Sequence, residues 1–199
     1  MNNIELQMKK LHEALSELDY IRPEEIPNID LYMDQVTTFM NEHLAQYKRH
    51  DEDKILTKTM INNYAKNNLL PPPVKKKYSK DHMLLLIFIY YYKNLLNFND
   101  IETLLRPITE NYFSGQGSLS LADIYNEVFS MEHGQMERLR KDLEAKRQAA
   151  KETFVQDSLK EEERQALQHF SFICALSFDV YLKKQLIEAM IDEMRRGDQ

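Results

Sequence analysis

Residues 56–105 read LTKTMINNYAKNNLLPPPVKKKYSKDHMLLLIFIYYYKNLLNFNDIETLL. Thr57 precedes a segment of helical period, and a Thr in that place accepts a hydrogen bond from the amides of the first turn. Asn68 stands where a helix ends, and Asn tolerates the left-handed backbone found there. The three prolines at 71–73 cannot be helical. The stretch therefore predicts a short helix over 58–67 and an extended segment up to Tyr78.

The second half of this stretch predicts two more helices. Ser79 is placed to cap an apolar helix that runs to Leu96. Residues 83–92, MLLLIFIYYY, are apolar all round, which predicts a central core helix. Asn99 and Glu102 have the spacing of a capping box for a short helix that ends before Pro107.

Outward from this stretch, almost every segment has helical period. We expect a helix over 4–18 and a second one, capped by Asp30, over 30–47. A longer helix carries an apolar stripe from Phe170 to Met194. Ser120 is placed to cap a helix over 121–130, and the charged residues 135–160 carry only a thin apolar stripe. The buried face of the 30–47 helix is expected to comprise Tyr32, Val36, Phe39, Met40, His43, Leu44 and Tyr47.

These patterns predict an all-α protein that can include one small β-wing. The loop at 114–118 holds two of the four glycines and marks the best boundary. The expected organisation is an N-terminal helix at 1–27, a helical domain at 28–113 and a helical C-terminal region at 118–199.

Composition excludes several functional classes. With four glycines, no GxxxxGK[ST] or GxGxxG phosphate loop exists, and a single Cys excludes a disulfide framework or a multi-cysteine zinc site. We find no catalytic motif, and so expect no enzyme activity, catalytic residue, metal or cofactor. No segment resembles a targeting signal, and the ten-residue apolar run is short of the roughly 20 residues that cross a bilayer. We therefore expect a cytoplasmic protein without a membrane partner.

Charge is distributed unevenly along the chain. The net charge is −6, yet residues 48–93 hold ten Lys and Arg against four Asp and Glu, a local net of +6. A basic segment within an acidic protein suggests an anionic partner at that segment. A solvated lysine surface on an ordinary helical domain is the alternative interpretation.

The order of motifs in 56–105 resembles the winged helix-turn-helix of MerR-type transcriptional regulators. Asn68-Leu69-Leu70-Pro71-Pro72 is similar to the family's Gly-Leu-Leu-Pro-Pro, which follows the helix that enters the major groove. Further matches are Thr57, Tyr64, Tyr78-Ser79, Asn97-Phe98-Asn99 and Ile101. The chain departs from that family in a shorter wing, a longer linker between 47 and 57, and a tail of at least two helices.

The arrangement resembles still more closely a bacterial family known as domain of unknown function 1836, which shares this MerR-like core, over most of residues 28–125. The resemblance implies a cytosolic bacterial protein. The MerR-like order implies sequence-specific binding to double-stranded DNA in transcriptional control, through a helix-turn-helix domain at 28–113. It implies a homodimer too, since such proteins read two half-sites. The residues expected to contact DNA are Thr57, Lys58, Thr59, Asn62, Asn63, Tyr64, Lys66, Lys75, Lys76, Lys77 and Tyr78.

Two alternatives stay open at this point. One is a non-enzymatic helical module that binds protein, favoured by the acidic C-terminal helices. The other is a small-molecule sensor, whose pocket the many Tyr, Phe and Met residues would line.

Overall fold

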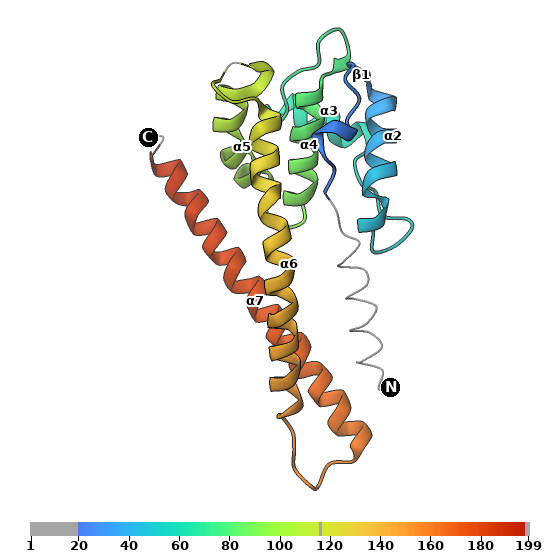
Figure 1. Cartoon of the computed structure of the whole chain (residues 1–199), viewed down its shortest axis with the longest axis vertical. Helices are drawn as coiled ribbons and strands as arrows, with labels where there is room; N and C mark the ends of the chain where they lie inside the picture. Colours follow the sequence, from blue (N-terminus) through green and yellow to red (C-terminus); the bar gives the residue numbers. More distant parts are fainter. Residues whose placement is uncertain (1–19, 116, 198–199) are drawn as a thin grey trace. The chain divides into compact units, whose positions relative to one another are not determined.

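A computed structural model describes residues 20–115 and 117–197, and it is mostly helical (Figure 1). The all-α expectation is confirmed, with one antiparallel two-stranded sheet, β1–β2, among the described residues. The helix predicted at 4–18 lies outside them. The elements are η1 (Pro23–Glu25), β1 (Leu31–Tyr32), α2 (Met33–Leu44), η2 (Ala45–Tyr47), α3 (Lys58–Lys66), β2 (Lys77–Tyr78), α4 (Lys80–Tyr92), α5 (Phe98–Tyr112), η3 (Phe113–Gly115), α6 (Leu121–Lys151) and α7 (Glu161–Gly197).

The described residues form two compact units. One contains residues 21–129 together with 188–197, and the other contains residues 130–187. Helices α6 and α7 each contribute residues to both units. The domain boundaries suggested by the sequence stay predictions.

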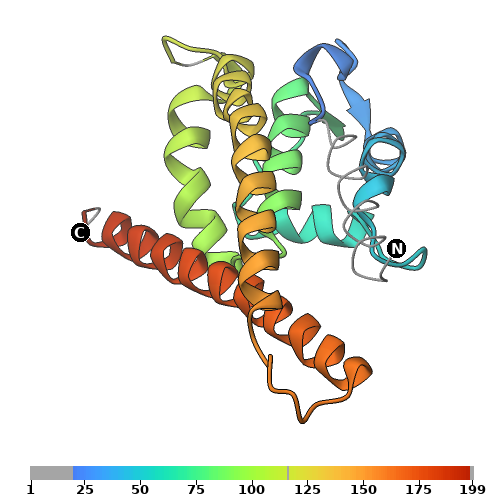
Figure 2. The same ribbon diagram turned by 60° about the horizontal axis from the view of Figure 1, so that its bottom comes forward.

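Helix α4 is the core of the unit that contains residues 21–129. Every residue from His82 to Tyr90 is buried, as expected for a helix that is apolar all round. α4 lies between α2 and α5 (Figure 2). The ring of Phe88 contacts those of Tyr125 and Phe129, at centroid distances of 5.3 and 5.5 Å. The predicted central helix is thus confirmed.

The predicted capping residues of α3 are confirmed as well, although the helix ends at Lys66, one residue earlier than expected. Thr57 Oγ1 accepts a hydrogen bond from the Met60 amide at 3.2 Å. Asn68 adopts a left-handed backbone with φ of 60°. The amides of Leu69 and Leu70 then donate to the Tyr64 carbonyl, and both leucine side chains are buried.

The predicted start of the preceding helix was wrong. α2 begins at Met33 because residues 31–32 pair with β2 in the sheet, so the helix cannot begin at Asp30. Its first turn is closed by Gln35, whose side chain accepts a hydrogen bond from the Tyr32 amide at 2.9 Å. Tyr32, expected on the buried face, is 53% exposed.

Three further helix ends differ from the expectation. α4 ends at Tyr92 rather than Leu96, and α5 is capped by Asn97 rather than Asn99. Asn97 lies two positions before the predicted cap, and its side chain accepts a hydrogen bond from the Asp100 amide. α5 also continues through Pro107. A proline removes one amide donor, and the helix tolerates this loss because Ile101, Thr103 and Leu105 bury its face.

The unit of residues 130–187 is an antiparallel hairpin of α6 and α7 (Figure 1). Leu143 and Ala150 pack against Phe172, with Leu139 and Leu176 at the edge. Lys146 forms an ion pair with Asp179 at 2.8 Å. Both helices extend beyond the predicted ranges, because α6 continues to Lys151 and α7 already begins at Glu161. The charged residues from 135 onward are therefore mostly helical.

Candidate nucleic-acid interface

Helix α3 exposes one polar face. The side chains of this face recur at steps of three and four residues, which places them on the same side of a helix. The opposite side is anchored by Ile61, which is fully buried, and by half-buried Tyr64, whose ring lies 6.4 Å from that of Phe98. The exposed members are Lys58, Thr59, Asn62, Asn63 and Lys66.

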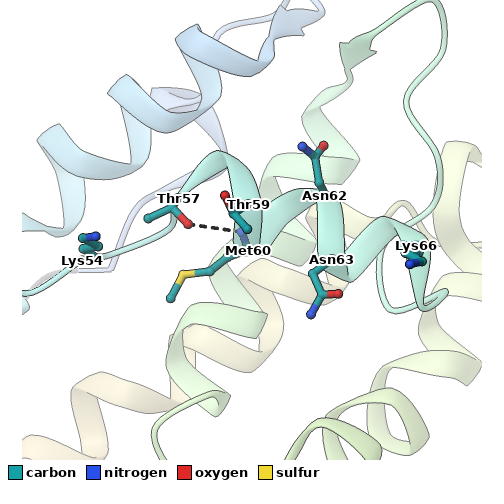
Figure 3. Close-up of a pocket in the computed structure, with 7 residues that line it drawn as sticks. All are labelled: Lys54, Thr57, Thr59, Met60, Asn62, Asn63 and Lys66. Carbon is teal, nitrogen blue, oxygen red and sulfur yellow. Dashed lines mark hydrogen bonds between the residues drawn. The ribbon is translucent and has the colours of Figure 1, made fainter.

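An open groove of about 720 Å³ follows this helix (Figure 3). Asn62 and Asn63 project from opposite edges of α3 in this view. Lys54, from the linker before the helix, lies at one end, and Lys66 lies at the other. The lining residues are Lys54, Thr57, Thr59, Met60, Asn62, Asn63 and Lys66.

The side chains of this face differ in how they are engaged. Asn63 Oδ1 accepts a hydrogen bond from Asn67 at 3.0 Å, and Lys58 forms an exposed ion pair with Asp34. Within the described part of the chain, Thr59 and Asn62 make no side-chain hydrogen bond. These two side chains are thus available to an external partner, and the exposed Lys58 pair contributes little to stability.

A tight hairpin at residues 74–77, here called the wing, carries three lysines. Val74 and Lys77 exchange backbone hydrogen bonds of 3.1 and 3.0 Å. The two central residues have positive φ, 52° for Lys75 and 65° for Lys76. Positive φ at both positions is the pattern of a type I′ turn, which normally takes Asn-Gly. Two lysines there hold exposed charges at the tip at a cost of about 1–2 kcal/mol each.

The wing and the start of α3 are connected through the first turn of α2. Tyr32 pairs with Lys77 in the sheet, and the Lys77 ammonium lies 5.2 Å from the Tyr32 ring centroid. Two residues later, Asp34 pairs with Lys58, the first residue of α3. The wing lysines and the first residue of α3 therefore flank the same turn.

Lysines are concentrated in the part of the sequence that forms this surface. Residues 54–80 contain seven lysines and no acidic residue. Arg, the commonest reader of bases, is missing from the same range. The surface is consequently suited to backbone phosphates, with Asn and Thr as its candidate base readers.

Three of the residues expected to contact DNA are engaged within the chain. Tyr78 is only 3% exposed, and its ring contacts His82 at 5.4 Å. Tyr64 is half-buried, and burial raises its pKa. Thr57 is engaged as the cap of α3. The structure brings Lys58, Thr59, Asn62, Asn63 and Lys66 together on α3, while Lys75 and Lys76 are exposed at the wing and Lys77 is half-buried.

Three residues of the site were missed by the sequence analysis. Lys54 lines the groove, Tyr32 lies under Lys77, and Asp34 faces Lys58. The contacts of Tyr32 with Lys77 and of Asp34 with Lys58 join residues more than 20 positions apart, so no local sequence pattern could predict them. Outside the site, the sequence analysis also missed the buried His82, whose Nδ1 accepts a hydrogen bond from the Ser79 amide at 3.0 Å.

Two absences concern the described residues alone. None of their His, Cys, Asp and Glu side chains gather in groups of three that could hold a metal ion. None of the helices formed by these residues combines the length and the apolar character needed to cross a membrane.

The geometry defines a class: a mostly helical protein with a two-stranded sheet, a lysine-rich wing and a polar helix face. The chain belongs to the family described as Domain of unknown function (DUF1836), which matches residues 21–128. Comparisons with curated proteins and with solved structures gave no match.

Proposed function

We propose that this chain is a DNA-binding transcriptional regulator of the bacterial cytoplasm that reads duplex DNA through a MerR-like winged helix-turn-helix. In this proposal α2 is the first helix, α3 the recognition helix and residues 74–77 the wing. The observation that carries the proposal is the exposed polar face of α3. The first turn of α2 lies between the start of this face and the wing lysines, because it contacts Lys58 on one side and Lys77 on the other.

The chemistry of α3 suits the major groove of DNA, which admits an α-helix. Asn62 is exposed and can pair bidentately with adenine, and the Thr59 methyl can contact that of thymine. Lys54 and Lys66, at the two ends of the groove, would contact phosphates of the flanking backbone.

The wing lysines would position the protein rather than specify sequence. Lys75 and Lys76 are exposed at the tip, where ammonium groups contact phosphates without reading bases. Both lysines occupy turn positions that favour Asn and Gly, so they do not stabilise the turn. This supports a role for the two lysines in binding a partner.

We also propose that the protein is a homodimer. Helix-turn-helix proteins commonly bind two half-sites about 34 Å apart, and a second copy supplies the second recognition helix. Large apolar side chains of α7 support an association surface, since Phe178, Leu182 and Leu186 are each more than 60% exposed.

The test is binding of the purified chain to pooled genomic duplex fragments, followed by fluorescence anisotropy against salt. For five or six phosphate-contacting lysines, log K is expected to fall with log salt with a slope of about −5. Changing Lys75, Lys76 and Lys77 together to Ala should reduce that slope by about 2–3.

A matched variant removes the same charge elsewhere. Lys141, Lys151 and Lys160 are exposed and outside the basic segment, and their change to Ala should leave the slope within about 0.5 of the wild-type value. Failure of the wild-type chain to bind any fragment at low salt would contradict the DNA proposal.

The second candidate function is a helical module that binds protein, and the exposed apolar side chains of α7 favour it. Under this function the chain associates with a protein partner and shows no salt-dependent DNA binding. The DNA measurement above therefore separates the two.

A further inference from the structure

The linker between α2 and α3, residues 48–57, is longer than a tight turn but has a defined structure. The Asp53 carboxylate accepts hydrogen bonds from the amides of Arg49 and His50, at 3.1 and 3.0 Å. Ile55 and Leu56 are both 2% exposed, so they fix the end of the linker in the core. Only Thr57 then separates this buried pair from α3.

Lys93, the residue directly after α4, holds this linker by its backbone. Its ammonium donates to the Ile55 carbonyl at 2.5 Å and to the Lys54 carbonyl at 3.4 Å. It also lies 5.0 Å from the centroid of the Tyr90 ring. The side chain is half-buried, and burial lowers its pKa, while the Asp53 carboxylate acts in the opposite direction.

These contacts connect the core helix with the start of the proposed recognition helix. α4 is rigidly buried from His82 to Tyr90, and Lys93 extends from its end. The two carbonyls that Lys93 holds lie two and three residues before Thr57, whose side chain caps α3. A helix of nine residues is marginal by itself, so its position depends on how its ends are held.

We propose that Lys93 is a positioning residue that fixes the N-terminus of α3 in the orientation needed for DNA, an inference that rests on the proposed function. Its role differs from that of the wing lysines. Its ammonium is already bound by carbonyls and is half-buried, so it contacts no phosphate and releases no counterion.

The variant Lys93→Met keeps the aliphatic stem over Tyr90 and removes the ammonium. Lys93→Arg restores a charged donor and is the rescue variant. Lys80→Met removes one lysine charge from the basic segment without touching the linker carbonyls, and it is the matched control.

The first measurement is hydrogen exchange of the free protein, without DNA. The amides of Met60 and Ile61 bond to Thr57 and report whether the start of α3 is held. Lys93→Met should raise their exchange rates about tenfold, the scale of losing one charged hydrogen bond. Lys93→Arg should return the rates toward the wild-type values, and Lys80→Met should leave them unchanged.

The second measurement is DNA affinity against salt. Lys93→Met should weaken binding about tenfold at every salt concentration, with the slope unchanged. Loss of a phosphate contact would instead reduce the slope by about 0.9.

The two measurements separate the two proposals. Unchanged exchange at Met60 and Ile61 in Lys93→Met would overturn the positioning role, and so would a reduced slope. Faster exchange in a chain whose wild type binds no DNA would leave the positioning of α3 standing and remove the DNA function. If Lys93→Met does not fold by circular dichroism, Lys93→Gln, which retains one neutral donor, is measured with the same expected direction.

Discussion

Helices α4 and α7 are both rich in large apolar residues, but the two helices differ in how far these residues are buried. In α4, nine consecutive residues from His82 to Tyr90 are buried within their own unit. In α7, one side packs on α6 through Phe172 and Leu176, while Phe178, Leu182 and Leu186 are 65%, 64% and 63% exposed. An apolar run therefore shows that burial is needed, but not which molecule provides it.

The largest effect is expected where burial is complete within the chain. Ile87→Ala removes methyl groups from a fully buried site and should lower the free energy of unfolding by about 2–5 kcal/mol. Urea denaturation of the dilute chain measures this.

Leu182→Ala is the matched change on α7, where the side chain is 64% exposed. It should alter the same free energy by about 0.5 kcal/mol or less. Equal effects of the two variants would break the comparison, because α7 would then be as fully buried as α4.

The next effect concerns association. If a second copy covers the exposed apolar side of α7, sedimentation at tens of micromolar should give twice the chain mass. Leu182→Glu should return the mass to that of one chain while circular dichroism keeps its helical signal, because a charge is costly in an apolar interface. A wild-type chain that sediments as a monomer would refute the dimer.

The exposed Glu162 offers a position for comparison, since Glu162→Lys changes a charge on the same helix outside this apolar group. It should leave the mass of the wild type unchanged. Loss of the dimer in this variant as well would point to a general charge effect.

The sequence predicted features that rest on local chemistry. Thr57 as a cap, Asn68 in the left-handed region and the buried run of α4 all depend on neighbouring residues, and all three were confirmed. The polar face of α3 followed from spacing in the same way.

Features that depend on distant contacts were missed or wrong. The start of α2 is set by pairing with β2, more than 40 residues away, so Asp30 was a false cap. Tyr78 carries a motif match but is buried against His82, and only the folded chain shows this. Pro107 normally ends a helix, yet the packing of α5 outweighs its single lost donor.

A smaller effect concerns His82, the first buried residue of α4. Burial lowers its pKa below 6.5, outweighing the Pro71 and Pro72 carbonyls and the Asp81 and Asp30 carboxylates, which act in the opposite direction. The unfolded chain then binds a proton that the folded chain does not, so stability should decrease as the pH falls below 6.5.

The measurement is urea denaturation between pH 7.5 and pH 5, compared with His82→Gln. Gln at this position can still accept a hydrogen bond from the Ser79 amide, as in a capping box, and its side chain does not titrate. The decrease should be smaller in the variant. An identical decrease in both would assign the pH dependence to other groups.

The last expected effect on stability lies in the wing, where Lys75 and Lys76 occupy two positive-φ positions. Replacing Lys75 by Asn and Lys76 by Gly places the preferred residues at two positive-φ positions and should raise the free energy of unfolding by about 1 kcal/mol. The same change removes two exposed charges, so the salt slope of DNA binding should decrease by about 2.

Changing both lysines to Gln removes the same charges and keeps the strained backbone, so it should reduce the slope equally without the gain in stability. A chain that becomes more stable and binds DNA less would show that the wing lysines serve the partner. A more stable chain with unchanged DNA binding would show that the wing does not contact DNA.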